Sequence, residues 1–284
     1  MAEPPAPFAV GAAPALRGES AGEGIPTVLC HGITATRRYV VHGSRALERA
    51  GHRLVAFDAR GHGESDPAPR QEGYGYPYMV ADLEAVIDAE VGEGPIVLAG
   101  HSMGSHTAVS FALRNPDRVA GLIVIGPVYM GEVTAEALAY WDGLAEALEA
   151  GGIDGFLAYI DSNQETDPAW RDSVQRFTRE RLQQHLHLDA IVQALREVPR
   201  SRPFESLAEL EALEVPALVV ASRDAADPGH PYEVAVAYAA HLPQARLVGE
   251  QEGQSPLAWQ GGRLSREIAA FCAEPAVSER LRSA

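Results

Sequence analysis

The chain has 284 residues, of which 46% are apolar and 22% charged, enough for one large α/β domain or one domain with an inserted subdomain. Its 39 acidic residues outnumber the 23 basic ones, so the formal net charge is −16 at pH 7 and no basic surface is expected for nucleic acid or membrane lipid. The sequence contains no lysine, which excludes Schiff-base, pyridoxal-phosphate and P-loop chemistry because each needs a primary amine.

Short β-branched runs alternate with longer amphipathic segments along the chain, the pattern of parallel strands joined by crossover helices. The first two dozen residues, rich in Ala and Pro, are expected to be partly irregular. The expected strands cover residues 25–30, 53–58, 95–100, 119–126, 217–222 and 245–249. Helices are expected over residues 79–88 and from Ser105 to about Asn115. The predicted fold class is α/β, with a mostly parallel, doubly wound sheet.

The interval 131–205 breaks this alternation. It is rich in Ala, Leu, Glu, Trp and Tyr at helical spacing, and Gly151-Gly152 and Asp167-Pro168 punctuate it. We expect about three or four helices lying over the sheet and forming the apolar walls of a pocket; ordinary packing helices are the alternative. The predicted organisation is an irregular segment at 1–24, an α/β core at 25–130 and 206–284, and a helical cap at 131–205.

A serine lies between an expected strand and an expected helix, in the motif Gly100-His101-Ser102-Met103-Gly104. The two glycines permit a tight turn with close backbone approach on both sides. Such a turn exposes the serine hydroxyl at the carboxyl edge of the sheet, where the helix N-terminus favours negative charge. Ser102 is therefore the candidate nucleophile, and a purely structural turn is the alternative.

Two further glycine turns follow expected strands. At His31-Gly32-Ile33 the amide N–H of Ile33 can pair with that of Met103 to hold an oxyanion. The next turn reads Asp58-Ala59-Arg60-Gly61-His62-Gly63-Glu64-Ser65. In this order and spacing, the three motifs resemble the α/β-hydrolase family over the first 130 residues. The resemblance implies a Ser-His-Asp triad in the chain order serine, acid, histidine, and a helical cap inserted between the sixth and seventh strands.

The resemblance places the acid at Asp224, after the strand at 217–222, with Asp227 as the alternative. A turn or helix-capping carboxylate is the non-catalytic interpretation of this position. The family's histidine follows the last strand, usually in a Gly-His pair, but here Gln254 follows Gly253. A glutamine amide is neutral and can orient a group or a water, but it cannot accept the serine proton.

His230 is the predicted replacement base, because its loop leaves the same sheet edge and six residues can span the distance from Asp224 to the serine. A surface histidine without a catalytic role is the alternative, and Glu252 is a weaker candidate that needs a raised pKa. His31, His101 and Gln254 are predicted to contact substrate. No constellation has metal-ligand spacing, and neither a metal nor a cofactor is expected.

The favoured interpretation is a hydrolase that cleaves a small or medium, largely apolar ester, lactone or thioester through Ser102, with Asp224 orienting His230. Two alternatives stay open. One is a lyase, cyclase or decarboxylase that never deprotonates the serine, and the other is a ligand-binding relative without turnover. A small-molecule substrate is the expected partner, with a monomer or homodimer as the assembly. Two apolar-flanked cysteines and the absence of a basic leader pattern predict a cytoplasmic location.

Overall fold

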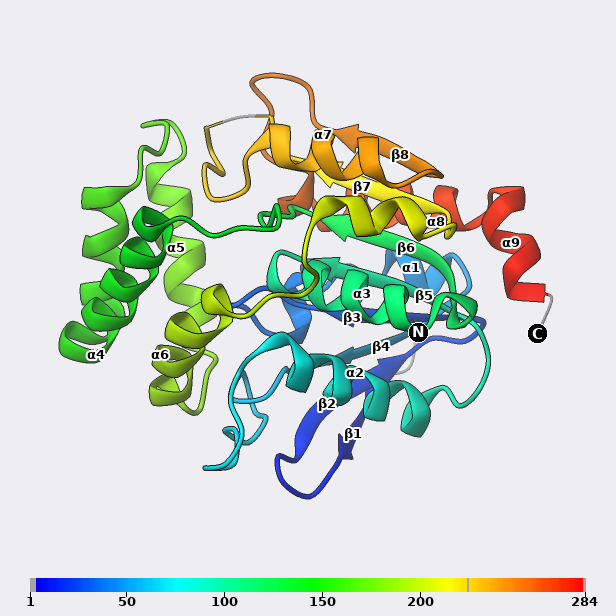
Figure 1. Cartoon of the computed structure of the whole chain (residues 1–284), viewed down its shortest axis with the longest axis horizontal. Coiled ribbons are helices and arrows are strands. Elements are labelled where there is room, and N and C mark those ends of the chain that lie inside the picture. The colour runs from blue at the N-terminus through cyan, green and yellow to red at the C-terminus, as the bar shows by residue number, and fades with distance from the viewer. Residues whose placement is uncertain (1–3, 224, 283–284) are drawn as a thin grey trace.

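The computed structural model describes residues 4–223 and 225–282, which contain one eight-stranded sheet (Figure 1). The strand order is β1-β2-β4-β3-β5-β6-β7-β8, and all pairings from β4 to β8 are parallel. This confirms the predicted α/β class with a mostly parallel sheet. The strands are β1 (Ala6–Val10), β2 (Leu16–Ala21), β3 (Ile25–Cys30), β4 (His52–Phe57), β5 (Ile96–His101), β6 (Val119–Ile125), β7 (Ala217–Ala221) and β8 (Ala245–Gly249).

The segment 1–24 is not irregular throughout, contrary to the expectation from its composition. Strands β1 and β2 form an antiparallel hairpin, and β2 pairs antiparallel with β4 from Gly18 opposite Phe57 to Ala21 opposite Leu54. Most of β1 is exposed at the sheet edge, so it shows no alternation of apolar and polar residues. The pairing of β2 with β4, a tertiary contact, attaches the hairpin to the sheet.

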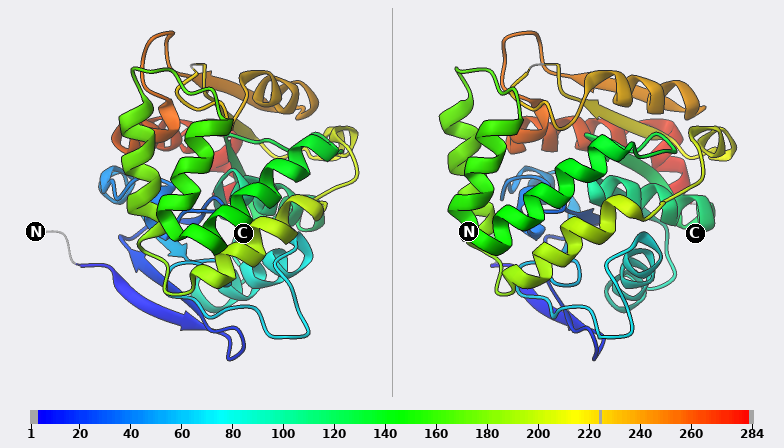
Figure 2. Two further views of the ribbon diagram at one scale, coloured as in Figure 1. Left: turned by 90° about the vertical axis from the view of Figure 1, so that its left-hand side faces the viewer. Right: turned by 60° about the vertical axis from the view of Figure 1, so that its left-hand side comes forward.

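Helices cover both faces of the sheet (Figures 1 and 2). In β5, Ile96 and Leu98 pack in the cluster that contains α2, α3 and α7, whereas Val97 and Ala99 pack in the cluster of α1, α8 and α9. Parallel strands that are buried on both faces have nearly continuous apolar sequences, so the sequence of β5 by itself predicts a strand. The helices are α1 (Ala46–Arg49), α2 (Tyr76–Glu90), α3 (Met103–Arg114), α7 (Tyr232–His241), α8 (Gly261–Cys272) and α9 (Pro275–Arg282), and the short 3-10 turns are Arg37–Tyr39, Pro116–Arg118, Val198–Arg200, Leu207–Ala212 and Leu257–Trp259.

Between β6 and β7 the chain forms α4 (Ala135–Asn163), α5 (Arg171–Leu182) and α6 (Leu188–Glu197), here called the α4–α6 segment. It lies beyond the carboxyl ends of the parallel strands, at the left of Figure 1. Gly152, with φ +57° and ψ −150°, bends α4 into two arms. Apolar residues of α4 and α6 pack against Ile33 and Met103 of the core. The sheet edge that carries Ser102 is therefore covered by an apolar layer.

Within the described ranges, no helix combines the length and the apolar character needed to cross a bilayer.

Three buried histidines each accept a hydrogen bond from a backbone N–H, which requires an unprotonated ring nitrogen. The bonds run from the N–H of Ala59 to His31 Nε2 (2.9 Å), of Gly63 to His185 Nδ1 (2.8 Å) and of Val128 to His106 Nε2 (3.0 Å). Burial is the main cause that lowers the pKa of all three rings from 6.5 to about 3. The three imidazoles are thus neutral in the folded protein.

We expect the free energy of unfolding to fall as the pH is lowered from about 6.5. Below that pH an unfolded histidine binds a proton that its folded counterpart excludes, so each of the three rings lowers stability by about 1.4 kcal/mol per pH unit. Thermal unfolding followed by circular dichroism at neutral pH and at about pH 5 measures this loss. His106→Gln, which keeps a hydrogen-bond acceptor but cannot titrate, is the control and flattens the dependence. A Tm that is unchanged over this range contradicts the prediction.

Candidate active site

Ser102 lies at the sharp turn between β5 and α3, with φ +52° and ψ −118°, a conformation that residues other than glycine rarely adopt. The flanking glycines are required sterically. A Cβ on Gly100 would collide with the carbonyl of Gly104, and a Cβ on Gly104 would collide with the carbonyl of Cys30. The strand, the helix and the two glycines therefore hold the serine in a strained backbone conformation at the sheet edge.

The turn at Gly32 lies directly beside Ser102. A Cβ on Gly32 would be 3.4 Å from Ser102 Cβ and 3.1 Å from His101 Nδ1. His62 fixes the same turn from behind, because its Nε2 is 2.7 Å from the carbonyl oxygen of Ile33. Met103 is the first residue of α3, so its N–H has no acceptor within the helix. The amides of Ile33 and Met103 thus belong to two backbone segments that adjoin Ser102.

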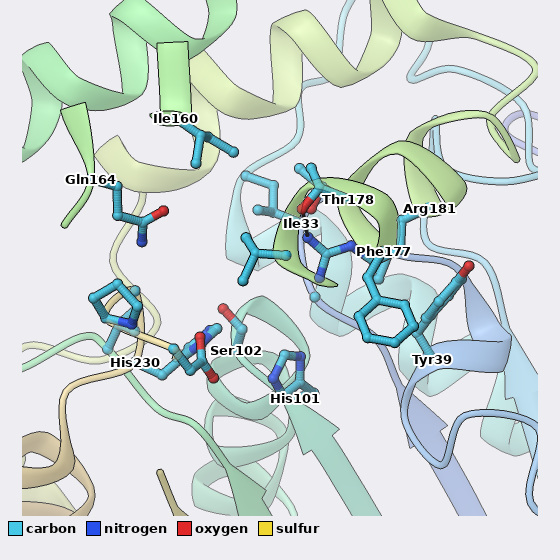
Figure 3. A pocket seen from close by; sticks show the side chains of 18 of the residues that line it. Ile33, Tyr39, His101, Ser102, Ile160, Gln164, Phe177, Thr178, Arg181 and His230 are labelled. Atoms are coloured by element: carbon cyan, nitrogen blue, oxygen red, sulfur yellow. Dashed lines mark hydrogen bonds and ion pairs between the residues drawn. The ribbon is translucent and has the colours of Figure 1, made fainter. Parts of the chain in front are cut away.

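His230 lies on the loop between β7 and α7, where its Nδ1 is 2.8 Å from Asp227 Oδ1. The two side chains are 17% and 11% exposed, respectively. The N–H of Ser102 donates to the carbonyl of Ile125 (2.9 Å), and a Cβ on the next residue, Gly126, would be 3.1 Å from the His230 ring. The imidazole therefore packs beside the backbone that anchors Ser102, and Figure 3 shows the His230 and Ser102 side chains on the same side of the pocket. Its bond to Asp227 leaves Nε2 as the nitrogen for an incoming proton.

The Asp227 carboxyl is ionised at neutral pH. Burial by itself raises its pKa, but the nearby charge and hydrogen bond of His230, together with His101 and Arg181, hold the pKa below its ordinary value. The ring of His101 is centred 4.9 Å from that of His230, and burial is the main cause that holds the pKa of His101 well below 6.5. The carboxylate can therefore orient the His230 ring and stabilise its protonated form.

A pocket with a volume of about 190 Å³ opens over Ser102, between the sheet edge and the α4–α6 segment. His101, Asp227 and His230 line it together with Ser102. Its walls are largely apolar and comprise Ile33, Val128, Tyr140, Trp141, Leu144, Phe156, Ile160, Val174, Phe177 and Trp259. The pocket thus combines the serine and the imidazole with an apolar environment, as small-molecule sites commonly do.

The other predicted site residues lie in different surroundings. Asp224, the predicted acid, is outside the described residues. Gln254 is exposed, accepts a hydrogen bond from Arg263 (3.0 Å) and is not among the residues that line the pocket. His31 is buried and also absent from that lining, because its ring bonds to neighbouring backbone. Among the described residues, no hydrogen bond joins Ser102 Oγ to His230; in free enzymes such bonds are often long until substrate binds.

Several polar residues that line the pocket were not identified from the sequence, among them Gln164, Thr178 and Arg181. Gln164 follows α4, and Thr178 and Arg181 lie on α5. Such residues on helices usually face solvent, and no local motif shows which side of α5 meets the sheet. Arg181 faces the pocket because of the way α5 packs against the sheet edge, which is a tertiary contact.

Known proteins are similar to this chain in sequence and in fold. Residues 26–260 match the family model described as alpha/beta hydrolase fold. The 2-hydroxy-6-oxononadienedioate/2-hydroxy-6-oxononatrienedioate hydrolase 2 of Pseudomonas putida is 31% identical over 216 residues, which cover 72% of each chain. Epoxide hydrolase B of Mycobacterium tuberculosis is 36% identical over 109 residues, but the match spans 38% of this chain and only 30% of that protein. A thermophilic esterase from Thermogutta terrifontis has the same fold, with a TM-score of 0.76 at 24% identity over 95% of this chain and 98% of its own. The family model and the matched relatives show that this chain belongs to the α/β-hydrolase fold family.

Proposed function

We propose that the protein is a serine hydrolase that cleaves small or medium-sized carboxylic esters, lactones or thioesters. The observation that carries this proposal is the hydrogen-bonded pair of Asp227 and His230, which lies beside the strained turn of Ser102 in one apolar pocket. An imidazole whose Nδ1–H is bound by a carboxylate presents Nε2 as a general base. His230 therefore supplies the basic nitrogen that Gln254 lacks.

In this mechanism, Ser102 Oγ attacks the substrate carbonyl carbon while its proton passes to His230 Nε2. Asp227 stabilises the imidazolium that forms. The amides of Ile33 and Met103 donate to the oxyanion, and the N-terminus of α3 adds its partial positive charge. Collapse of the tetrahedral intermediate expels the leaving group, which takes the proton from His230. A water molecule, deprotonated by His230, then attacks the acyl-serine, and the acid is released as Ser102 Oγ takes the proton back from His230.

The surroundings of the site support a hydrolytic reaction on a small acyl group. The relatives named above are hydrolases of different substrates, so they support the class of reaction and leave the substrate to the shape of the pocket. The pocket is small and mainly apolar, which suits a short acyl chain. His101 lines it beside Ser102 and is proposed to contact the acyl group.

Covalent labelling with a fluorophosphonate probe tests the nucleophile. We expect one phosphonate adduct per chain, mapped to Ser102 by peptide mass spectrometry, because the probe reacts with serines that a neighbouring base activates. His230→Asn is expected to label much more slowly. If the wild-type protein neither labels nor hydrolyses p-nitrophenyl esters, the hydrolase proposal fails. That result would favour a lyase, cyclase, decarboxylase or ligand-binding function, none of which needs the serine proton to move.

A further inference from the structure

We propose that Arg181 binds a carboxylate on the substrate, so that the pocket prefers acyl groups with a terminal carboxylate over neutral acyl groups of the same length. This inference rests on the proposed function, because it assigns the substrate class of the same pocket. Arg181 is in the last turn of α5, and its guanidinium lines the pocket that contains Ser102.

The guanidinium of Arg181 has unused hydrogen-bonding capacity. Its Nη2 donates to Thr178 Oγ1 at 3.2 Å, whereas its buried Nε has no partner in the described part of the chain. Among the described residues, no carboxylate oxygen lies within 4.0 Å of the Arg181 guanidinium, the distance limit of an ion pair. A guanidinium carries five N–H donors in a planar fork that matches a carboxylate. A half-buried cation with open donors is unfavourable, and an anionic ligand would satisfy it.

The position of Arg181 relative to the reacting group suits an extended acyl chain. In Figure 3, Arg181 and His230 lie on opposite sides of Ser102, and the Arg181 side chain extends from α5 toward the pocket interior. With the substrate carbonyl at Ser102, the acyl chain can run along the apolar wall and end at the guanidinium. The leaving group then lies on the side of His230, which must protonate it.

The negative charge of the protein means that an anionic substrate needs a positive group in the pocket, and Arg181 is such a group. The chain carries a formal net charge of −16, which repels anionic ligands in general. Among the described residues that line the pocket, Asp227 is the acidic one, and His230 already binds its carboxylate. A local cation is therefore needed for an acidic substrate, and Arg181 supplies it.

A second role of Arg181 has to be separated from this one. Its charge also contributes to lowering the pKa of Asp227. A purely electrostatic partner of the acid affects kcat for every substrate alike. A carboxylate-binding residue changes the ratio of kcat/KM between an anionic and a neutral substrate, and does so mainly through KM.

The test compares p-nitrophenyl valerate with the p-nitrophenyl half-ester of glutaric acid, whose acyl groups have the same length and end in a methyl group and a carboxylate, respectively. We expect the wild type to prefer the half-ester, and Arg181→Met to lower that preference about tenfold to a hundredfold, the range of a lost charge-assisted contact. Arg181→Lys, which keeps the charge but not the planar fork, retains part of the preference. Arg179→Met is the matched control: Arg179 is on the same helix, but it pairs with exposed Asp154 at 2.7 Å outside the pocket. We expect the Arg179→Met enzyme to keep the wild-type preference for the half-ester.

Equal losses on both esters in Arg181→Met, or a wild type without preference for the half-ester, would overturn the proposal. A separate measurement keeps it testable if neither ester is hydrolysed. Glutarate and butyramide are then titrated by isothermal calorimetry. Glutarate binding that weakens at least about tenfold in Arg181→Met but not in Arg179→Met supports the carboxylate site without hydrolysis, whereas equal binding to all three proteins refutes it.

Discussion

Replacing Ser102 by alanine is expected to lower kcat for p-nitrophenyl butyrate by about a millionfold, the loss that removal of the nucleophile causes in a serine protease. The oxyanion donors and the pocket remain, so a residual acceleration over water of about 10³ to 10⁴ is expected. Steady-state kinetics at high enzyme concentration, with circular dichroism to verify folding, measure the effect.

Ser110→Ala is the matched control for this variant. Ser110 is a buried serine of the same helix, and its Oγ has no hydrogen-bond partner among the described residues. Its removal leaves no polar group newly unsatisfied, so kcat stays within about twofold of wild type. A Ser102→Ala enzyme that keeps a tenth or more of the wild-type kcat would show that another group attacks the carbonyl.

Replacing His230 by asparagine is expected to lower kcat by about ten-thousandfold to a millionfold, because the variant keeps a polar side chain near Asp227 but has no basic nitrogen. The same kinetic assay measures the loss. His241→Asn is its control: His241 also pairs with a carboxylate, Glu211 at 2.9 Å, but at the far end of α7. A His230→Asn enzyme with nearly full activity would remove the imidazole from the mechanism and leave Glu252 or a bound water as the base.

Asp227→Asn and Asp224→Asn, assayed side by side, identify the acid. A wrongly oriented histidine costs about 10⁴ in kcat when the acid of a protease triad becomes an amide. The structure favours the larger loss in Asp227→Asn, because this carboxylate holds His230 Nδ1.

Much of the fold was predictable because its determinants are local. Strands such as β5 and β6 are buried on both faces, so each is a short apolar run between turns. The β1–β2 hairpin was not predictable in this way. The hairpin is partly exposed, with β1 at the sheet edge, and β2 depends on β4 for its register.

The residues of the site also fall into those that the sequence predicts and those that it does not. Ser102 could be identified because the tight turn needs glycine on both sides, and that requirement is visible in the sequence. The sequence favours Asp224 as the acid with Asp227 as the alternative, whereas the structure pairs Asp227 with His230, because the pairing depends on how one loop folds back toward Ser102. Arg181 is one of 23 arginines, and only the docking of α5 on the sheet edge directs it inward.

The pairing of Asp227 with His230 within a single loop has a consequence for the robustness of the enzyme. In a triad whose histidine follows the last strand, proton transfer requires two distant stretches of chain to meet in register. Here both ionisable partners are three positions apart in one loop, so the pair needs no residue from the turn at Gln254. The exposed turn that contains Gln254 can then diverge without separating the two side chains of the pair.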